Sequence, residues 1–184
     1  MNINYIEGDL FAAIKNRTKP VCIPHICNNQ GAWGAGFVVP LGRNYPKARE
    51  RYLAGQMKLG RTGFLTIEEP PLPRILICNM IAQELGGMRP LFYNALAKCL
   101  DRVARRIDGW GFEIHAPAFG SGLAGGDWKV IEPLIQDCWI RSGVAEAVNI
   151  YFLPGTFLPP ELPTEGPVDR PYTKKSHTGN DFPG

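Results

Sequence analysis

Hydrophobic and polar residues follow short periods along the first part of the chain. Asn2 to Glu7 alternates apolar and polar positions, which predicts a strand. After Gly8-Asp9, the pattern of Leu10 to Lys15 predicts a short helix. Val21 to Ile26 is an apolar run behind Pro20 and predicts a second strand. The chain therefore begins as strand, helix and strand.

This alternation of elements continues to residue 153. Leu91 to Ile107 has the clearest helical pattern, because its apolar residues form one stripe and Gly109 closes it. Pro90 is expected in the first turn of this helix. The other expected strands are Phe64–Ile67, Arg74–Ile81, Phe112–Ala116 and Ala147–Leu153, and the other expected helices are Lys47–Leu59 and Trp128–Ile140. Strands that alternate with helices indicate an α/β fold, a layered sheet with helices on both faces.

The composition changes after this last strand. From Pro154 to Gly184 the chain is rich in Pro, Gly, Thr and charged residues. Such a segment buries too little apolar surface to order itself alone. We therefore expect one domain over residues 1–153 and a C-terminal tail over 154–184. An extended arm packed on the domain is the alternative.

Charge and cysteine content restrict the classes of partner and compartment. The net charge is +3 without a clustered basic face, which does not predict strong binding to duplex nucleic acid. The five cysteines form no Cys-x-x-Cys pair and the three histidines are dispersed, so we expect reduced thiols, no metal and no cofactor. No apolar run reaches about 18 residues, and the chain is expected to be cytoplasmic, without a membrane segment.

Two glycine-rich loops carry the candidate chemistry. Gly120 to Gly125 matches Gly-x-Gly-x-x-Gly, follows an expected strand and opens an expected helix. Glycines let backbone N–H groups approach a diphosphate, and the start of a helix adds partial positive charge. Glu146 lies about 20 residues further on, as in dinucleotide-binding proteins. However, only one helix and one strand follow the loop, which argues against a dehydrogenase.

The first glycine-rich loop follows the second strand. Asn28, Asn29 and Gln30 precede Gly31, Gly34 and Gly36 here, and their amides suit sugar hydroxyls. The loop lacks the Lys-Ser/Thr pair of a Walker A motif. Because strands of an α/β sheet end at ligand-binding crevices, the two loops predict one cleft for an anionic nucleotide. Two unrelated tight turns are the alternative.

Three segments together resemble the macrodomain family. They are GDL, PHICNNQGAWGAGFVVPLGRNYPKARERY and FGSGLAGGDW, and the resemblance extends from about Asn2 to Leu153. The second segment is similar to the yeast-type ADP-ribose 1″-phosphate phosphatase branch. GDLF and AWGAGF also resemble the terminal ADP-ribose glycohydrolase branch. The resemblance implies a three-layer α/β/α fold with a mixed central sheet.

The resemblance also implies ligand contacts at matching positions. Asp9 corresponds to the acidic residue that accepts a hydrogen bond from the adenine amino group, and Gly8 and Leu10 lie beside it. Tyr151 and Leu153 fall where the family flanks the adenine. Expected contacts in the first loop are Cys27, Asn28, Asn29, Gln30, Gly31, Trp33, Gly34, Ala35, Gly36 and Phe37. Those in the second are Phe119, Gly120, Ser121, Gly122, Leu123, Ala124 and Gly125.

The candidate catalytic residues are His25, Asn28 and Asp127. Hydrolysis of a 1″-phosphate requires a positioned water, and His25 ends a strand at the cleft and ordinarily titrates near neutral pH. A structural histidine is the equal alternative. Asp127 stands at a helix start, where an N-cap is the simpler interpretation. Trp33 is expected either to cover the ligand or to anchor its own loop.

The resemblance excludes one mechanism. One glycohydrolase branch acts through a covalent lysine after the fourth strand, and Gln83 takes that position here. An amide cannot form the Schiff base that a lysine amine forms, so catalysis would use water. Three hypotheses remain: a phosphatase for ADP-ribose 1″-phosphate, a hydrolase that removes ADP-ribose from a modified macromolecule, and a reader that binds ADP-ribose without turnover.

Overall fold

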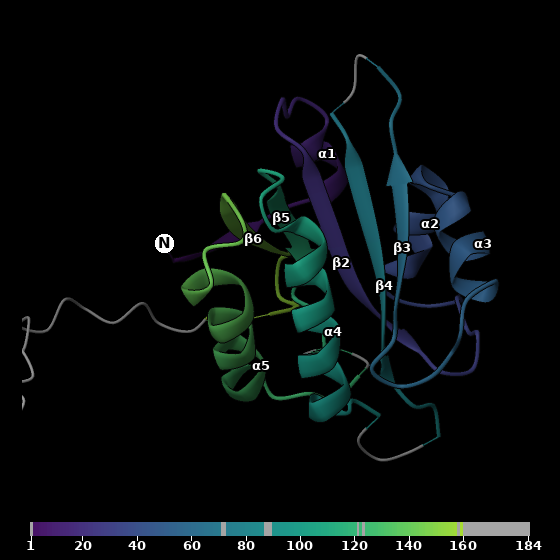
Figure 1. Cartoon of the computed structure of the whole chain (residues 1–184). Coiled ribbons are helices and arrows are strands. Elements are labelled where there is room, and N and C mark those ends of the chain that lie inside the picture. The colour runs from purple at the N-terminus through teal and green to yellow at the C-terminus, as the bar shows by residue number, and fades with distance from the viewer. Residues whose placement is uncertain are drawn as a thin grey trace, which may run out of the picture.

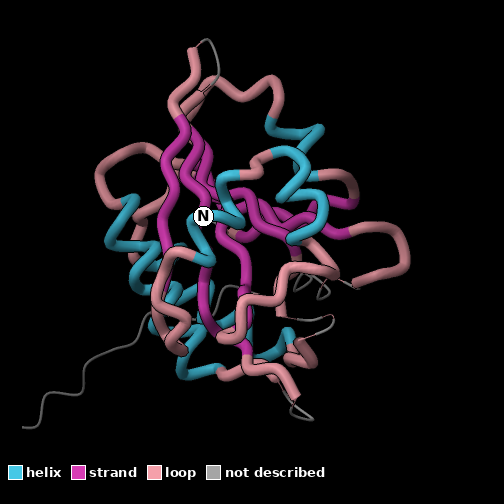
Figure 2. The backbone as a smooth tube through the Cα atoms, turned by 90° about the vertical axis from the view of Figure 1, so that its right-hand side faces the viewer, coloured by secondary structure: helices cyan, strands magenta, loops and turns pink. Residues whose placement is uncertain are grey.

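The computed structural model describes residues 2–70, 73–86, 90–120, 122, 124–157 and 159. Within these residues a six-stranded sheet lies between two layers of helices (Figures 1 and 2). The strands are β1 (Ile3–Glu7), β2 (Val21–Asn28), β3 (Thr62–Ile67), β4 (Ile75–Gln83), β5 (Glu113–Pro117) and β6 (Ala147–Phe152). The helices are α1 (Leu10–Ile14), α2 (Val38–Asn44), α3 (Lys47–Leu53), α4 (Tyr93–Ile107) and α5 (Trp128–Ile135), which continues as the π-helix η1 (Gln136–Arg141).

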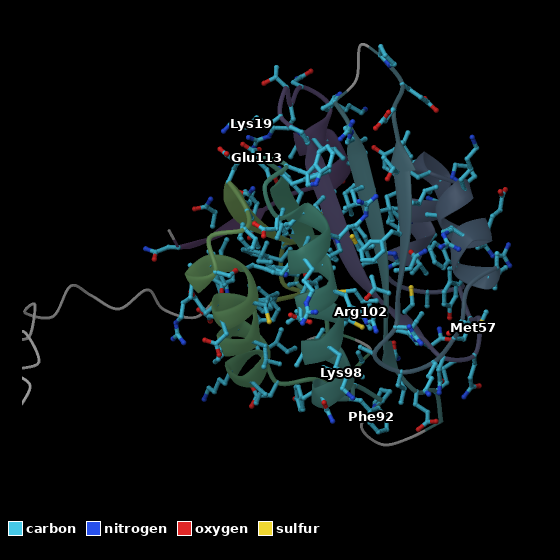
Figure 3. The ribbon with its side chains drawn as sticks, in the orientation of Figure 1. Lys19, Met57, Phe92, Lys98, Arg102 and Glu113 are labelled. Carbon is cyan, nitrogen blue, oxygen red and sulfur yellow. The ribbon has the colours of Figure 1, made fainter. Side chains whose placement is uncertain are left out.

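The sheet is mixed, as the resemblance implied. Its strand order is β1-β6-β5-β2-β4-β3, and every neighbouring pair is parallel except β3 with β4. The five parallel strands therefore end at the same edge of the sheet. Figure 3 shows both edges: Lys19 and Glu113 lie at the edge where these strands begin, and Phe92 lies at the edge where they end.

Alternating side chains of the central strands pack into two hydrophobic cores, one on each face of the sheet. On β4, Leu76, Cys78 and Met80 pack with α4 and α5, whereas Ile75 and Ile77 pack with the helices of the other face. Because both faces are covered, β4 is an unbroken apolar run rather than an alternating one. The apolar stripe predicted for α4 is buried as expected, and the α/β layering is confirmed.

The start of α4 and the end of α3 differ from the sequence prediction, and the expected helix Trp128–Ile140 changes from α5 to η1 after Ile135. Helix α4 begins at Tyr93, because Leu91 forms an antiparallel β-bridge with Gln83 and its N–H donates to the Ala124 carbonyl. Pro90 therefore precedes this bridge and does not occupy the first turn. Helix α3 ends at Leu53 instead of Leu59, since Gly55 follows its C-cap and disfavours helix.

The first residues of the predicted tail pack on the domain. The Phe157 ring lies 5.0 Å from that of Trp128, 6.1 Å from Tyr5 and 5.5 Å from Phe152, centre to centre. Residue 158 and residues 160–184 lie outside the described part of the chain. Among the residues that are described, none of the helices combines the length and apolar character that a membrane span requires.

Candidate functional site

Residues of both glycine-rich loops line one cavity of about 580 Å³. It lies at the edge of the sheet where β2, β4 and β5 end, the position in which open α/β sheets bind ligands. The predicted residues that line it are His25, Asn28, Gly34, Ala35, Gly36, Phe37, Phe119, Gly120, Gly122 and Ala124. The expectation that the two loops share one cleft is therefore confirmed. Ser121 and Leu123 lie outside the described residues.

Asn28 organises the first loop from within. Its side chain is 7% exposed, and its Oδ1 accepts hydrogen bonds from the N–H groups of Gln30 at 2.9 Å and Ala32 at 3.1 Å. Its Nδ2 donates to the Ala32 carbonyl at 2.7 Å. Most of the hydrogen-bonding capacity of this amide is thus used inside the protein. One N–H of Nδ2 is left for a ligand in the cavity.

Tyr52 of α3 supports the same loop and was missed by the sequence prediction. Its hydroxyl, buried with the rest of the 2% exposed side chain, lies 2.6 Å from the carbonyl oxygen of Asn28 and 2.9 Å from its Oδ1. The hydroxyl also accepts from the Gly31 N–H at 3.0 Å. Burial raises the pKa of Tyr52 to about 12, so the hydroxyl keeps its proton. No local motif connects Tyr52 with the loop.

Trp33 anchors the loop rather than covering the cavity. Its ring meets that of Tyr52 at 5.5 Å and stands edge-on to His25 at 5.7 Å. A side chain at Gly42 of α2 would place Cβ only 2.9 Å from the indole Nε1, so glycine is needed where the indole packs on this helix. The structure thus favours the interpretation that Trp33 anchors its loop over the interpretation that it covers the ligand.

Cys27, Asn29, Gln30 and Gly31 do not line the cavity and support the loop around it. Cys27 is 3% exposed and packs with Tyr52 and Ile81. The side chains of Asn29 and Gln30 reach the chain after β4, at Glu84 Oε1 (3.2 Å) and the Leu85 carbonyl (3.1 Å). These two contacts hold the first loop beside Gln83 and Leu85, which line the cavity and were not among the predicted contacts.

His25 is a buried, neutral residue of the cavity wall. Its side chain is 1% exposed and its Nε2 lies 2.6 Å from Asn79 Oδ1. Loss of solvation on burial lowers its pKa to about 4, although the bond to Asn79 opposes this shift. The expected titration near neutral pH is therefore wrong, because that expectation used the pKa of a solvated imidazole.

Asn79 determines which nitrogen of His25 carries the proton. Asn79 is fully buried on β4, and its Nδ2 donates to the carbonyl of Ala48 on α3 at 3.0 Å. Its Oδ1 therefore faces His25, whose Nε2 must donate. The lone pair is then on Nδ1, which accepts from the Cys27 thiol at 3.8 Å. This arrangement suits a positioning role better than proton transfer.

The glycines of the two loops have different tasks. A Cβ on Gly120 would lie 2.8 Å from Ile131, and one on Gly126 would lie 2.4 Å from Leu91, so these two glycines are required by packing. A Cβ on Gly34 or Gly122 would meet nothing within 4 Å. Neither of these two has a left-handed backbone that would demand glycine. Open glycines at a cavity suit close approach of a ligand to the backbone.

Asp127 caps a helix outside the cavity. Its carboxylate accepts from the Lys129 N–H at 2.9 Å, and its own N–H donates to the Tyr93 hydroxyl at 2.7 Å. The side chain is exposed and does not line the cavity, so the structure supports the N-cap interpretation. Gly125 lies in the turn before it, with its N–H bonded to the Gly122 carbonyl at 2.9 Å.

The residues assigned to the adenine lie beyond the cavity. Asp9 is exposed and caps α1, with Oδ1 accepting from the Phe11 N–H at 2.8 Å; Gly8 precedes it and Leu10 is buried. Leu153 is 57% exposed at the end of β6. Tyr151 is different, because its buried hydroxyl lies 2.9 Å from His115 Nδ1 and not at the surface.

The electrostatics of the cavity favour an anion. Among the described residues that line it, none is acidic and His25 is the only titratable one. The rest of the described lining is glycine, small or apolar side chains, and the amides of Asn28 and Gln83. In the described part of the chain no three His, Cys, Asp or Glu side chains gather as metal ligands would.

The chain resembles curated proteins and solved structures. It is 24% identical to an ADP-ribose 1″-phosphate phosphatase of Lodderomyces elongisporus, over 74% of this chain and 92% of that protein. The protein of the same name from Saccharomyces cerevisiae is 25% identical, again over 74% and 92%. No family model matches the chain.

Among solved structures, the macrodomain of Mycobacterium tuberculosis DarG shares the fold, with a TM-score of 0.62 and 23% identity over 81% of this chain and 96% of that one. A macrodomain protein of Streptomyces coelicolor is more similar in sequence. It is 35% identical over 82% of this chain and 99% of that chain, with a TM-score of 0.64. With this identity over nearly the whole of its relative, and with both glycine loops at the carboxyl edge of a mixed sheet, the chain belongs to the macrodomain family.

Proposed function

We propose that this protein hydrolyses ADP-ribose 1″-phosphate to ADP-ribose and phosphate. The observation that carries the proposal is the 580 Å³ cavity, in which two glycine-rich loops converge without any described acidic side chain. The curated relatives named as phosphatases for this compound support the choice of substrate. Phe37 and Phe119 provide apolar walls beside the glycines, as a nucleotide sugar requires.

We assign each glycine-rich loop to one part of the ligand. The first loop, from Asn28 to Phe37, holds the distal ribose, and the remaining N–H of Asn28 Nδ2 donates to a hydroxyl. The second loop, from Gly120 to Gly125, holds the diphosphate and the distal phosphate through backbone N–H groups. Asp9 binds the adenine amino group outside the cavity. Open space at Gly34 and Gly122 supports the close approach that this placement needs.

The proposed reaction is a transfer of the phosphoryl group to water. Water forms a bond to phosphorus, the bond from phosphorus to the 1″ oxygen breaks, and the ribose oxygen gains a proton. The groups that line the cavity act mainly by stabilising charge on the phosphate oxygens, which backbone amides do well in a fixed geometry. Gln83 lies at the wall and cannot form a Schiff base, which supports a water-dependent route.

His25 and Asn28 support this reaction as positioning residues. The bond of His25 to Asn79 fixes the wall, and its low pKa leaves it uncharged beside the anion. Asp127 has no part in the reaction in this scheme, because its carboxylate caps α5.

A phosphate-release assay tests the proposal. Wild-type protein and Gly122→Ala are incubated with ADP-ribose 1″-phosphate, and inorganic phosphate is measured. We expect release by the wild type and a loss of at least about tenfold in the variant, since a methyl group would occupy the space of the ligand. Release at the buffer rate by the wild type would refute a phosphatase.

A second candidate function is removal of ADP-ribose from a modified protein or nucleic acid. Gly34, Ala35 and Gly36 are exposed, so the ribose end of the cavity opens toward solvent and has room for an attached group. Release of ADP-ribose from modified glutamate or modified DNA would favour this function. Binding of ADP-ribose without turnover of either substrate would indicate a reader, a protein that binds ADP-ribose without catalysis.

We also infer a reducing, cytoplasmic setting for this activity. All five cysteines are free, and the sulfurs of Cys22 and Cys78 lie 3.6 Å apart without a bond. Burial raises the pKa of the Cys78 and Cys27 thiols well above the usual value, which keeps them protonated and unreactive.

A further inference from the structure

A second cavity, of about 520 Å³, lies at the opposite end of β4 from the cleft. Arg74 and Leu76 border it at the start of the strand, whereas Gln83 borders the cleft at its end. At about 3.3 Å per residue, the seven steps from Leu76 to Gln83 separate the two sites by roughly 23 Å. The second cavity lies at the edge of the sheet that Glu113 marks in Figure 3. Nothing in the proposed reaction uses this second cavity.

The floor of this cavity is apolar and its wall is aromatic. Leu76 is 1% exposed and Phe112 is 4% exposed, and both reach the cavity from the core. Trp110, in the turn after α4, is 57% exposed, the same as Leu153 and more than the other large apolar side chains of the described chain. An indole with this much free surface is suited to stacking against another ring.

Two arginines give the cavity a positive charge. Arg74 pairs with Glu68 at 2.6 Å, and its guanidinium carbon lies 5.3 Å from the centre of the Trp110 ring. Arg106, in the last turn of α4, lies over the ring of Phe64 at 6.0 Å. Among the described residues no carboxylate comes within ion-pair distance of Arg106. The described lining therefore holds two guanidinium groups against one carboxylate.

We propose that this cavity binds a nucleoside phosphate, with its base against Trp110 and its phosphate on Arg106. A small inorganic anion would use Arg106 but leave the apolar floor and the indole exposed. A neutral apolar ligand would leave the charge of Arg106 without a partner. A planar ring that carries a phosphate uses all three features, because arginine binds phosphate through paired N–H donors and bases stack on aromatic side chains.

Tryptophan fluorescence measures this binding. Trp128 and Trp139 are 9% and 0% exposed and Trp33 is half-buried, so the part of the quenching that is lost in Trp110→Leu reports on Trp110. Uridine 5′-monophosphate is titrated into protein without ADP-ribose, because ADP-ribose is itself a nucleoside phosphate and would compete for this cavity. Uracil is used because the cleft is assigned to an adenine nucleotide. We expect saturable quenching, no such signal with Trp110→Leu, and binding at least about tenfold weaker for Arg106→Gln.

Arg105→Gln is the matched control. Arg105 is an exposed neighbour in the same turn of α4, and it pairs with Asp101 at 3.0 Å instead of lining the cavity. This variant should bind as the wild type does. The absence of saturable binding, or an equal loss in the two arginine variants, would overturn the proposal. Uridine that binds as tightly as its monophosphate would overturn it as well. These comparisons do not depend on whether the protein hydrolyses ADP-ribose 1″-phosphate, because neither arginine lines the cleft.

The nucleoside phosphate could be free or the end of a strand. A 5′-phosphorylated pentamer of uridine distinguishes the two sources. Affinity for the pentamer more than tenfold above that for the monophosphate would assign the site to single-stranded nucleic acid. Equal affinities would assign it to a free nucleotide.

Discussion

The hydroxyl of Tyr52 lies 2.6 Å from the carbonyl oxygen of Asn28 and 2.9 Å from its side-chain oxygen, and so ties helix α3 to the loop that borders the cleft. The same hydroxyl accepts the Gly31 N–H. Tyr52 does not line the cavity, so it acts on a ligand only through the shape of this loop.

Replacement of Tyr52 by phenylalanine tests this link. The change removes the hydrogen bonds that the Asn28 oxygens and the Gly31 N–H make with this hydroxyl, which costs about 1–3 kcal/mol in the free energy of unfolding. We expect a lower midpoint in urea and a Kd for ADP-ribose that rises about fivefold to tenfold as the loop loses its order. Calorimetric titration and denaturant melts measure the two effects.

Tyr45→Phe is the control for this variant. Tyr45 is half-buried, and its hydroxyl makes no hydrogen bond with the described residues. Its stability and its affinity should stay near those of the wild type. Equal losses in both variants would show that the Tyr52 hydrogen bonds do not shape the loop.

The two classes of glycine predict opposite effects of adding one methyl group. Gly122→Ala should keep the stability of the wild type and lose ADP-ribose binding, because its Cβ meets only open space in the unliganded protein. Gly126→Ala should lose stability by about 1–3 kcal/mol, since its Cβ would overlap Leu91. Thermal melts with and without ADP-ribose separate these results. Stable Gly122→Ala protein that still binds would remove the loop from the ligand site.

The pKa of His25 predicts a stability that depends on pH. Folding lowers this pKa from 6.5 to about 4, so the unfolded state binds more protons between these values. The stabilisation from a neutral His25 is complete above pH 6.5 and is lost as the pH falls toward 4, a decrease of roughly 3 kcal/mol. Denaturant melts from pH 7 to 4 should show a shallower decrease for His25→Gln.

Some pH dependence should remain in that variant. His115 is buried, and loss of solvation lowers its pKa as well, although its contact with Glu113 opposes this. Its contribution has the same sign as that of His25. Identical slopes in the wild type and His25→Gln would contradict the buried, neutral state of His25.

Truncation tests where the domain ends. Removal of residues 160–184 leaves Phe157 in its contacts with Tyr5, Phe152 and Trp128. Removal of residues 154–184 exposes these rings, and burial of a phenylalanine is worth about 1.5–3 kcal/mol. We expect a clearly lower Tm only for the shorter protein. Equal Tm values would support the boundary at residue 153 that the sequence predicts.

Much of the fold could be predicted from local patterns. The apolar stripe of α4 and the apolar runs of β2 and β4 are readable because burial on one or both faces imposes a period. The start of α4 was wrong by two residues, since the bridge between Leu91 and Gln83 depends on a partner from another element. The residues around Leu91 give no signal of this pairing with Gln83.

The site was predicted less completely, for the same reason. The glycine loops could be located because glycine spacing is a local signal. The role of His25 depends on its desolvation and on Asn79, which is 54 residues away. Tyr52 is 24 residues from Asn28, and no spacing rule connects them. Tyr151 also bonds to the buried His115, a contact that only the packed sheet creates.

The most direct test of the proposed function is phosphate release from ADP-ribose 1″-phosphate by protein that is shown to bind ADP-ribose. We expect release well above the buffer rate, inhibition by ADP-ribose, and loss of both binding and release in Gly122→Ala. Protein that binds ADP-ribose in the cleft but releases no phosphate would contradict the phosphatase and leave the cleft as a reader or a hydrolase of modified macromolecules.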